Sequence, residues 1–139
     1  MSRRVAREGI LRALFQIDLA GSDVNEAIRY ADEGLELTEN GLSFLHEIVQ
    51  GTYSNLAKIN KVIGDFAVGW TLERMPTVDR NILRAAVYEI LYREDIPESV
   101  VVNEAVELAK KYGDVDSPRF INGVLGNVVQ AFQEEQSPR

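Results

Sequence analysis

Helical structure is indicated most clearly by the stretch Gly113-Asp-Val-Asp-Ser-Pro-Arg-Phe-Ile-Asn-Gly-Val-Leu-Gly-Asn-Val-Val-Gln-Ala-Phe132. Ser117 can cap a helix, and Pro118 suits the first helical position because no backbone N–H is needed there. Apolar residues then recur at the spacing of one helix face, which predicts a helix from Ser117 onward. These apolar residues are Ile121, Val124, Leu125, Val128 and Phe132.

The other face of this predicted helix is unusual, because it carries Arg119, Gly123 and Asn127, with Phe120 at its edge. A glycine inside a helix costs roughly 1 kcal/mol relative to alanine. Gly123 therefore indicates that something approaches the backbone closely. Two explanations are open: a neighbouring helix crosses at this point, or the bare backbone beside an arginine and an aromatic ring receives a nucleic-acid or peptide ligand.

Helical periodicity extends over nearly the whole chain, and no alternating strand pattern is present. The pattern predicts helices over residues 2–20, 24–37, 38–66, 77–91, 97–112 and 117–132. Asp23 with Glu26 forms a capping pair for the second helix, and Thr38 begins the third. Residues 70–76 break the pattern as a short turn or helix. We therefore predict an all-α fold in which two groups of about three helices, residues 1–69 and 70–139, form one compact domain 1–139.

Composition excludes several classes of protein. The 139 residues are 45% hydrophobic and 27% charged, which is typical of a globular domain. There is no cysteine, no signal-peptide pattern and no apolar run long enough to cross a membrane. We therefore expect a cytoplasmic location. The net charge of −7 argues against broad, unspecific binding of nucleic acids but leaves room for a local basic patch.

Catalytic and metal-binding motifs are missing from the sequence. His46 is the only histidine, and His46-Glu-Ile-Val-Gln50 has a glutamine where a zinc-protease motif needs its second histidine. No glycine-rich loop ends in Gly-Lys-Ser or Gly-Lys-Thr, and no Ser/His/Asp set is supported. We predict that the protein is not an enzyme, that it needs no cofactor and no metal, and that His46 lies on the surface.

The N-terminus breaks a local preference. Arg3, Arg4, Arg7 and Arg12 fall within the first twelve residues, where Glu8 is the only acid. Cations in the first turns oppose the helix dipole, which favours anions there by about 0.3–1 kcal/mol each. Residues placed against local preference often mark function. At 3.6 residues per turn the first three arginines lie within about 100° of one another, so they form one basic surface.

Phe15 continues the line of this basic surface along the same predicted helix. The apolar arc that Phe15 bounds is about 200° wide, more than the core-facing stripe of a surface helix needs. Arginines that contact phosphates beside a ring that stacks on bases would form a site for single-stranded RNA. The alternative is that the arginines are merely solvated and that Phe15 belongs to the core.

Four blocks occur in this order along the chain: Ser2-Arg-Arg-Val-Ala-Arg-Glu8, Val78-Asp-Arg-Asn-Ile-Leu-Arg-Ala-Ala-Val-Tyr-Glu-Ile90, Asn103-Glu-Ala-Val-Glu-Leu-Ala-Lys-Lys-Tyr-Gly113 and Phe120-Ile-Asn-Gly-Val-Leu125. In order and spacing they resemble the family of the transcription antitermination factor NusB, and the last block is the most specific. The resemblance covers nearly the whole chain. It implies an all-helical fold of two three-helix bundles.

The resemblance also implies a function. Members of this family bind the boxA RNA element together with the small-subunit ribosomal protein NusE, and the complex modifies RNA polymerase elongation through other Nus factors, notably on ribosomal RNA operons. By resemblance, RNA contacts fall on Arg3, Arg4, Arg7, Phe15, Arg119 and Phe120. The NusE face falls near Asp79 and Asp116, both of which we expect to be exposed. Val5 stands where some relatives have another arginine, which implies weaker RNA binding.

Two other functions fit parts of the same pattern. The fold that the resemblance implies also begins certain RNA cytosine methyltransferases, but those enzymes need a Rossmann-like domain for the methyl donor, and this sequence contains none. A helical module that binds only protein is the other alternative. Whether RNA retention requires the basic N-terminal helix distinguishes that module from an RNA-binding protein.

Overall fold

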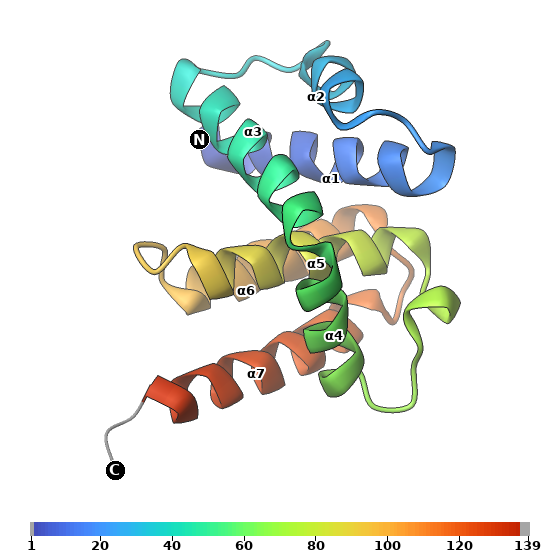
Figure 1. Cartoon of the computed structure of the whole chain (residues 1–139), viewed down its shortest axis with the longest axis vertical. Coiled ribbons are helices and arrows are strands. Elements are labelled where there is room, and N and C mark those ends of the chain that lie inside the picture. Colours follow the sequence, from blue (N-terminus) through green and yellow to red (C-terminus); the bar gives the residue numbers. More distant parts are fainter. Residues whose placement is uncertain (1, 137–139) are drawn as a thin grey trace. The chain divides into compact units, whose positions relative to one another are not determined.

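The computed structural model describes residues 2–136, and these residues form seven α-helices and one short 3₁₀ helix without any strand (Figure 1). This confirms the predicted all-α class. The helices are α1 (Ser2–Ala20), α2 (Val24–Asp32), α3 (Glu39–Ser54), α4 (Leu56–Phe66), α5 (Thr77–Tyr92), α6 (Glu98–Tyr112) and α7 (Ser117–Gln136), and the 3₁₀ helix η1 (Leu72–Arg74) lies between α4 and α5.

The chain divides into two compact units, residues 1–55 and 56–139. The first unit contains α1 to α3, and the second contains α4 to α7. The division differs from the expected boundary near residue 70 because α4 packs against α5 and α7. The second unit is therefore a bundle of four helices, not three.

The long helix that the sequence predicted over residues 38–66 is interrupted at Asn55. The backbone N–H of Asn55 donates to the carbonyl of Gly51 (3.0 Å), and its side-chain amide donates to the same oxygen (2.8 Å). These two hydrogen bonds to one carbonyl lie at the C-terminal end of α3, and α4 begins at the next residue. The apolar stripe continues through the break, so periodicity alone could not reveal it.

The first unit is held together by helix contacts among α1, α2 and α3. Asp23 caps α2 by accepting from the N–H groups of Asn25 and Glu26, and Thr38 caps α3 by accepting from Gly41, as the sequence predicted. α2 ends at Asp32, several residues before the predicted Leu37, and Gly34 then adopts a positive φ of 79°. The largest fully buried side chains of this unit are Ile10, Leu14, Ile28, Leu45, Ile48 and Val49.

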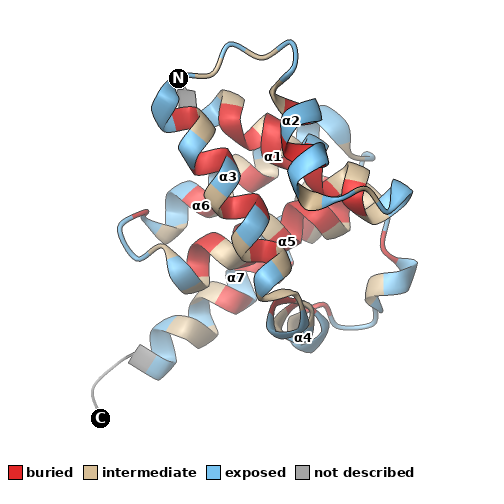
Figure 2. Cartoon of the chain, turned by 45° about the horizontal axis from the view of Figure 1, so that its top comes forward, coloured by how far each residue is buried: buried red, intermediate tan, exposed pale blue. Residues whose placement is uncertain are grey.

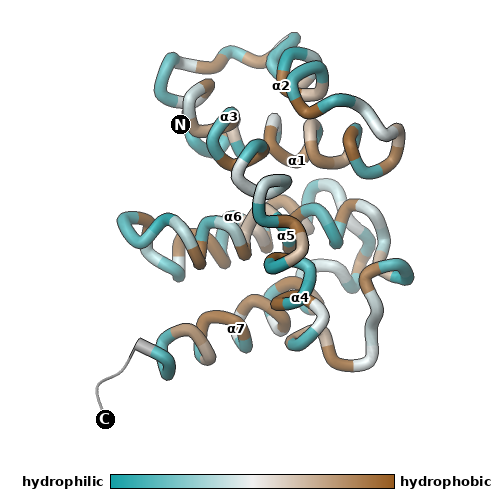
Figure 3. Tube along the Cα trace, viewed as in Figure 1, coloured by the Kyte–Doolittle hydropathy of each residue, from teal (hydrophilic) through white to brown (hydrophobic). Residues whose placement is uncertain are grey.

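The second unit is organised around α5, which packs against α4, α6 and α7. Figure 2 shows buried residues along nearly the whole of α5, and Figure 3 shows both hydrophobic and hydrophilic stretches along it. Some of the buried residues are polar: Arg84 donates to the side-chain oxygens of Asn60 (3.0 Å) and Asn81 (3.2 Å). Each of these donors and acceptors thus has a partner inside the protein, which offsets the cost of burying it.

Candidate nucleic-acid interface

In the first unit, two of the arginines of the predicted basic surface lie over the same aromatic ring. The guanidinium carbon of Arg3 lies 4.7 Å from the centre of the Phe44 ring, and that of Arg7 lies 5.2 Å from it. Arg3 and Arg7 are one helical turn apart on α1, and Phe44 projects from α3, which packs against α1. A cation over an aromatic ring gains about 0.5–2 kcal/mol, more when it is shielded from water. Phe44 therefore holds two of the three predicted arginines.

These arginines differ in accessibility. Arg3 and Arg4 are exposed, whereas only 7% of the surface of Arg7 is accessible. Arg7 is therefore almost completely covered, and Arg3 and Arg4 are the accessible cations of the three. We refer to Arg3, Arg4 and Arg7 as the basic cluster.

Arg12 has a different role from the arginines of the basic cluster. Its guanidinium donates to the main-chain carbonyls of Ala31 (3.4 Å) and Glu33 (3.2 Å) at the C-terminal end of α2. These are carbonyls that a helix end leaves without a partner, and a cation is favourable beside them. Arg12 thus joins α1 to the end of α2.

Phe15 is half-buried on α1. Its neighbours along the buried face of the helix, Leu11 and Leu14, are almost completely covered. The ring is neither a full member of the core nor a fully exposed side chain. Both explanations that the sequence left open for Phe15 remain, and a substitution can separate them.

The second unit contains a pocket of about 470 Å³ near the start of α7. The ring of Phe120 meets the ring of Trp70 edge to face, with the centres 5.8 Å apart and the planes at 61°. Trp70 is 48% exposed and Arg119 is exposed, so a ligand can reach both. We refer to this site as the aromatic pocket; its lining residues are Trp70, Pro76, Asp79, Asp114, Asp116, Ser117, Arg119 and Phe120.

Asp79 does not lie where the sequence predicted. It is only 4% exposed, so the expectation of an exposed carboxylate is wrong for Asp79, although it is correct for Asp116. The hydroxyl of Ser117 donates to Asp79 Oδ1 over 2.8 Å and accepts from the N–H of Asp114 over 2.9 Å. Burial raises the pKa of Asp79; the hydrogen bond from Ser117 partly opposes that rise, and the nearby charge of Asp114 adds to it.

Ser117 also differs from its predicted role. An N-cap hydroxyl accepts from N–H groups within the first turn of its own helix. The Ser117 hydroxyl instead accepts from Asp114, which precedes the helix. Ser117 therefore closes the turn before α7 and connects that turn to α5 through Asp79.

Gly123 lies on the exposed surface of α7. A Cβ atom built at this position meets no atom within 4 Å outside its own helix backbone. The first explanation for this glycine, a neighbouring helix crossing at close range, is therefore wrong for the described structure. The open backbone beside Arg119 and Asn127 leaves the ligand explanation to be tested.

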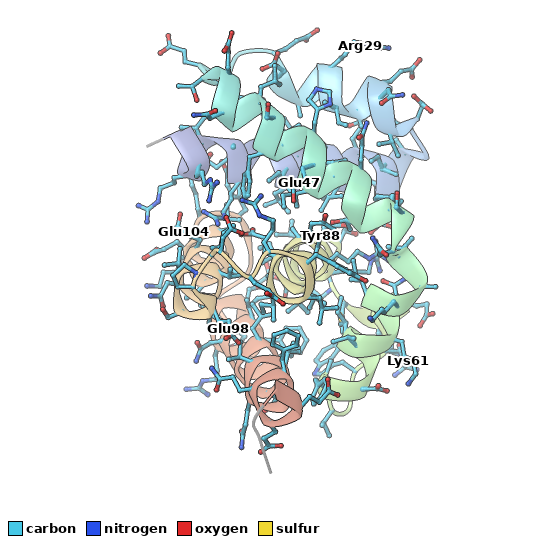
Figure 4. The ribbon with its side chains drawn as sticks, turned by 60° about the vertical axis from the view of Figure 1, so that its left-hand side comes forward. Arg29, Glu47, Lys61, Tyr88, Glu98 and Glu104 are labelled. Carbon is cyan, nitrogen blue, oxygen red and sulfur yellow. The ribbon has the colours of Figure 1, made fainter. Side chains whose placement is uncertain are left out.

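Charged residues elsewhere form ordinary surface contacts. Arg29 and Lys61 extend from exposed helix faces in Figure 4, and Lys61 pairs with Asp65 over 3.1 Å. His46 is exposed, as predicted. Among residues 2–136 no group of three or more histidine, cysteine, aspartate or glutamate side chains is placed to hold a metal ion. Within the same residues, no helix is long and apolar enough to cross a membrane.

Comparison with known proteins identifies the family. The NusB family model matches residues 4–130. The chain belongs to the NusB family. The transcription antitermination protein NusB of Pelotomaculum thermopropionicum is 52% identical over 134 residues, which cover 96% of this chain and 93% of that protein. NusB proteins are transcription antitermination factors without enzymatic activity, in agreement with the function and the absence of catalysis predicted from the sequence.

Solved NusB structures have the same fold. A structure of NusB from T. maritima superposes with a TM-score of 0.86 at 33% identity, covering 94% of this chain and 92% of that one. A crystal structure of the antitermination factors NusB and NusE in complex with double-stranded RNA contains a chain that matches with a TM-score of 0.85 at 24% identity, covering 94% and 97% of the two chains. At that identity the second match supports the fold alone.

Two residues of this NusB-family chain were missed by sequence reasoning, Phe44 and Trp70. The spacing of Arg3 and Arg7 by four residues places both on one side of a helix, which was the available signal for a shared partner. Nothing in the sequence identifies that partner as Phe44, because the contact depends on how α1 packs against α3. Trp70 was assigned only to the break between helices, and its contact with Phe120 depends on the tertiary fold.

Proposed function

We propose that this protein binds boxA RNA together with the ribosomal protein NusE in the cytoplasm, and that the complex modifies RNA polymerase elongation through other Nus factors, notably on ribosomal RNA operons. Family membership supports the antitermination role. The observation that carries the RNA part is the aromatic pocket, where the accessible Trp70 and Arg119 flank Phe120. Aromatic and guanidinium planes are the surfaces on which proteins stack unpaired bases.

Each candidate residue has a distinct proposed task. Arg3 and Arg4 contact phosphates because they are the accessible cations of the basic cluster. Arg7 is almost completely covered on the same Phe44 ring, so its contact with RNA is limited to the small part that stays accessible. Phe120, Arg119 and the half-buried Phe15 contact bases or sugars. With a net charge of −7 the protein repels RNA at long range, so binding relies on these local contacts and on the partner.

NusE is proposed to dock on the second unit near Asp116. This carboxylate is exposed in the turn before α7 and can meet basic groups of a partner. Burial removes Asp79 from such a contact. The competing explanation for Asp116 is that an acid merely favours a helix N-terminus, by about 0.3–1 kcal/mol. Docking of NusE should survive replacement of Arg3 and Arg4 by alanine and should weaken in Asp116→Asn; the opposite result would contradict this assignment of faces.

Substitutions that remove a charge or a ring test the RNA contacts. Arg3→Ala should weaken binding to all RNA sequences similarly and reduce the slope of log affinity against log salt by about 1. Phe120→Ala should cost roughly 1–3 kcal/mol of binding free energy and leave that slope nearly unchanged. RNA titrations at several salt concentrations measure both quantities, and Lys61→Ala provides a control for removing an exposed cation outside the proposed site.

A thermal melt run beside these titrations separates stacking from packing. If Phe15 or Phe120 served only the core, its replacement by alanine would lower stability by about 3–5 kcal/mol, while the folded fraction would bind RNA normally. That outcome would refute the stacking role. If none of the substitutions changed RNA affinity, the protein would be a module that binds only protein.

A further inference from the structure

A buried hydrogen bond connects the starts of two helices of the second unit. Ser117 Oγ, at the first residue of α7, donates to Asp79 Oδ1, near the first residue of α5, and the two residues are 38 positions apart in the sequence. Both side chains are almost completely covered, with 2% and 4% of their surfaces exposed. The bond is thus a fixed tertiary connection and not a surface contact.

The turn before α7 closes on the same serine. The N–H of Asp114 donates to Ser117 Oγ (2.9 Å), and the N–H of Ser117 donates to the carbonyl of Asp114 (3.0 Å). A Cβ atom at Gly113 would lie 2.6 Å from both Cβ and Oγ of Ser117, so only glycine permits this close approach. Residues 113–117 are therefore folded around one hydroxyl group, whose proton points to Asp79.

The residues of the aromatic pocket follow directly from this turn. Arg119 and Phe120 are the second and third residues after Ser117, and the Phe120 ring contacts Trp70. Asp79 and Ser117 themselves line the same pocket. A shift of the first turn of α7 would therefore move both proposed RNA-contacting side chains relative to Trp70.

A carboxylate is a costly choice for a buried position if packing is its only purpose. Burying a charge is unfavourable unless hydrogen bonds compensate for the lost water, and an apolar residue of similar size avoids that cost. A carboxylate oxygen, however, accepts a shorter and stronger hydrogen bond than a neutral acceptor does. Asp79 thus contributes a strong hydrogen bond that fixes the position of the Ser117 hydroxyl.

We propose that Asp79 is a positioning residue for RNA binding: through Ser117 it fixes the turn 113–117 and so sets Arg119 and Phe120 against Trp70. The part that concerns RNA rests on the proposed function. The part that concerns the aromatic pocket does not, because it can be observed without RNA. Asp79 acts only through Ser117 and itself contacts neither RNA nor the partner protein.

Trp70 is the only tryptophan of the chain, so its fluorescence reports on the aromatic pocket directly. Three variants of the full chain test the connection: Asp79→Ala removes the acceptor, Ser117→Ala removes the donor, and Asp79→Asn keeps an oxygen that can accept from Ser117. Asp65→Ala, which removes an exposed carboxylate of α4, is the matched control. The measurements are the Trp70 emission maximum, its quenching by acrylamide, and affinity for a boxA RNA oligonucleotide, all made well below the melting temperature of each variant.

Asp79→Ala and Ser117→Ala should each shift the Trp70 emission, increase its quenching, and weaken RNA binding roughly tenfold, the effect of one lost hydrogen bond to a charged group. The double variant Asp79→Ala/Ser117→Ala should bind RNA no more weakly than whichever single variant has the lower affinity, because each single substitution already removes the same hydrogen bond. Asp79→Asn keeps an acceptor that is neutral and therefore weaker, so its fluorescence and affinity should lie between those of Asp79→Ala and the wild type, and Asp65→Ala should match the wild type.

The alternatives give different results. Weaker RNA binding with unchanged Trp70 fluorescence would overturn the proposal, because Asp79 would then act without the pocket. Altered fluorescence with unchanged RNA affinity would also overturn it, and so would an Asp79→Asn variant that behaves like Asp79→Ala. If the wild type bound no RNA, the proposed function would fail. The Trp70 fluorescence of the variants would still show whether Asp79 fixes the arrangement of the aromatic pocket. Should Asp79→Ala fail to fold, Ser117→Ala and Asp79→Asn provide the same comparison.

Discussion

The basic cluster of the first unit and the aromatic pocket of the second are built in opposite ways. In the first unit a buried aromatic ring, Phe44, holds the charged side chains of Arg3 and Arg7. In the second unit a buried charged group, Asp79, connects to the turn that presents an aromatic ring, Phe120. In both units the accessible side chain and the residue that supports it are far apart in sequence. The residue types that are accessible at each site therefore do not reveal which type of buried residue holds them in place.

The largest expected effect comes from removing the support in the first unit. Phe44 is 3% exposed, so Phe44→Ala should lower the free energy of unfolding by about 3–5 kcal/mol through the lost burial and the cavity left behind. Phe44→Leu keeps most of the apolar volume and should cost less than about 1.5 kcal/mol. Chemical denaturation of both variants measures these differences.

Phe44→Leu also separates the two roles of Phe44, because it removes the aromatic ring and keeps an apolar side chain in the core. Arg3 then loses its contact with the aromatic face, so RNA affinity at low salt should fall although the protein loses less than about 1.5 kcal/mol of stability and remains folded. Unchanged affinity and salt slope in this variant would show that the ring serves packing alone, and that the two units do not share the proposed division between support and surface.

An intermediate loss of stability is expected from a substitution that crowds the turn 113–117 of the second unit. Gly113→Ala places a methyl group 2.6 Å from Ser117 and 2.9 Å from the carbonyl of Ala109, so the turn must shift. Overpacking of this kind costs about 1–3 kcal/mol. The φ angle of Gly113 is −94°, which alanine adopts readily, so the loss would be steric. Denaturation of Gly113→Ala beside Gly64→Ala, whose Cβ meets nothing within 4 Å, tests this; equal effects would disprove the steric explanation.

The sequence was sufficient where local chemistry determines local structure. The caps at Asp23 and Thr38 were predicted from side-chain chemistry and are confirmed. Asn55 shows the limit of periodicity: an apolar stripe that continues in phase hides the break between α3 and α4 at this residue.

The supports of the candidate sites could not be predicted in this way. Asp79 and Asp116 are the same residue type, each close to the start of a helix, yet one is buried and the other exposed. Their difference depends on whether a partner such as Ser117 lies opposite, and a partner that is 38 residues away has no signature in the local pattern. The accessible arginines and Phe120 were identifiable because their residue types are unusual at their positions, whereas Phe44 resembles any core aromatic.

The smallest effect concerns the bare backbone beside the aromatic pocket. Gly123→Ala should stabilise the protein by roughly 0.5–1 kcal/mol, because alanine favours the helix and the added methyl group meets no atom within 4 Å. If RNA approaches the backbone here, the same methyl group should weaken RNA binding by about 1 kcal/mol, or about fivefold. The two effects have opposite signs, so a general loss of structure cannot imitate them.

Gly126→Ala is the matched control for this prediction. Gly126 is also exposed on α7 with no atom within 4 Å of its Cβ, so it should give a similar gain in stability. At 100° per residue, Gly123 lies about 60° from Phe120 around the helix and Gly126 about 120° from it, so only Gly123 borders the ring. Thermal melts and RNA titrations of both variants decide the question. A gain in stability with unchanged affinity at Gly123 would show that the ligand does not reach this surface, and would confine RNA contacts in the second unit to the aromatic pocket itself.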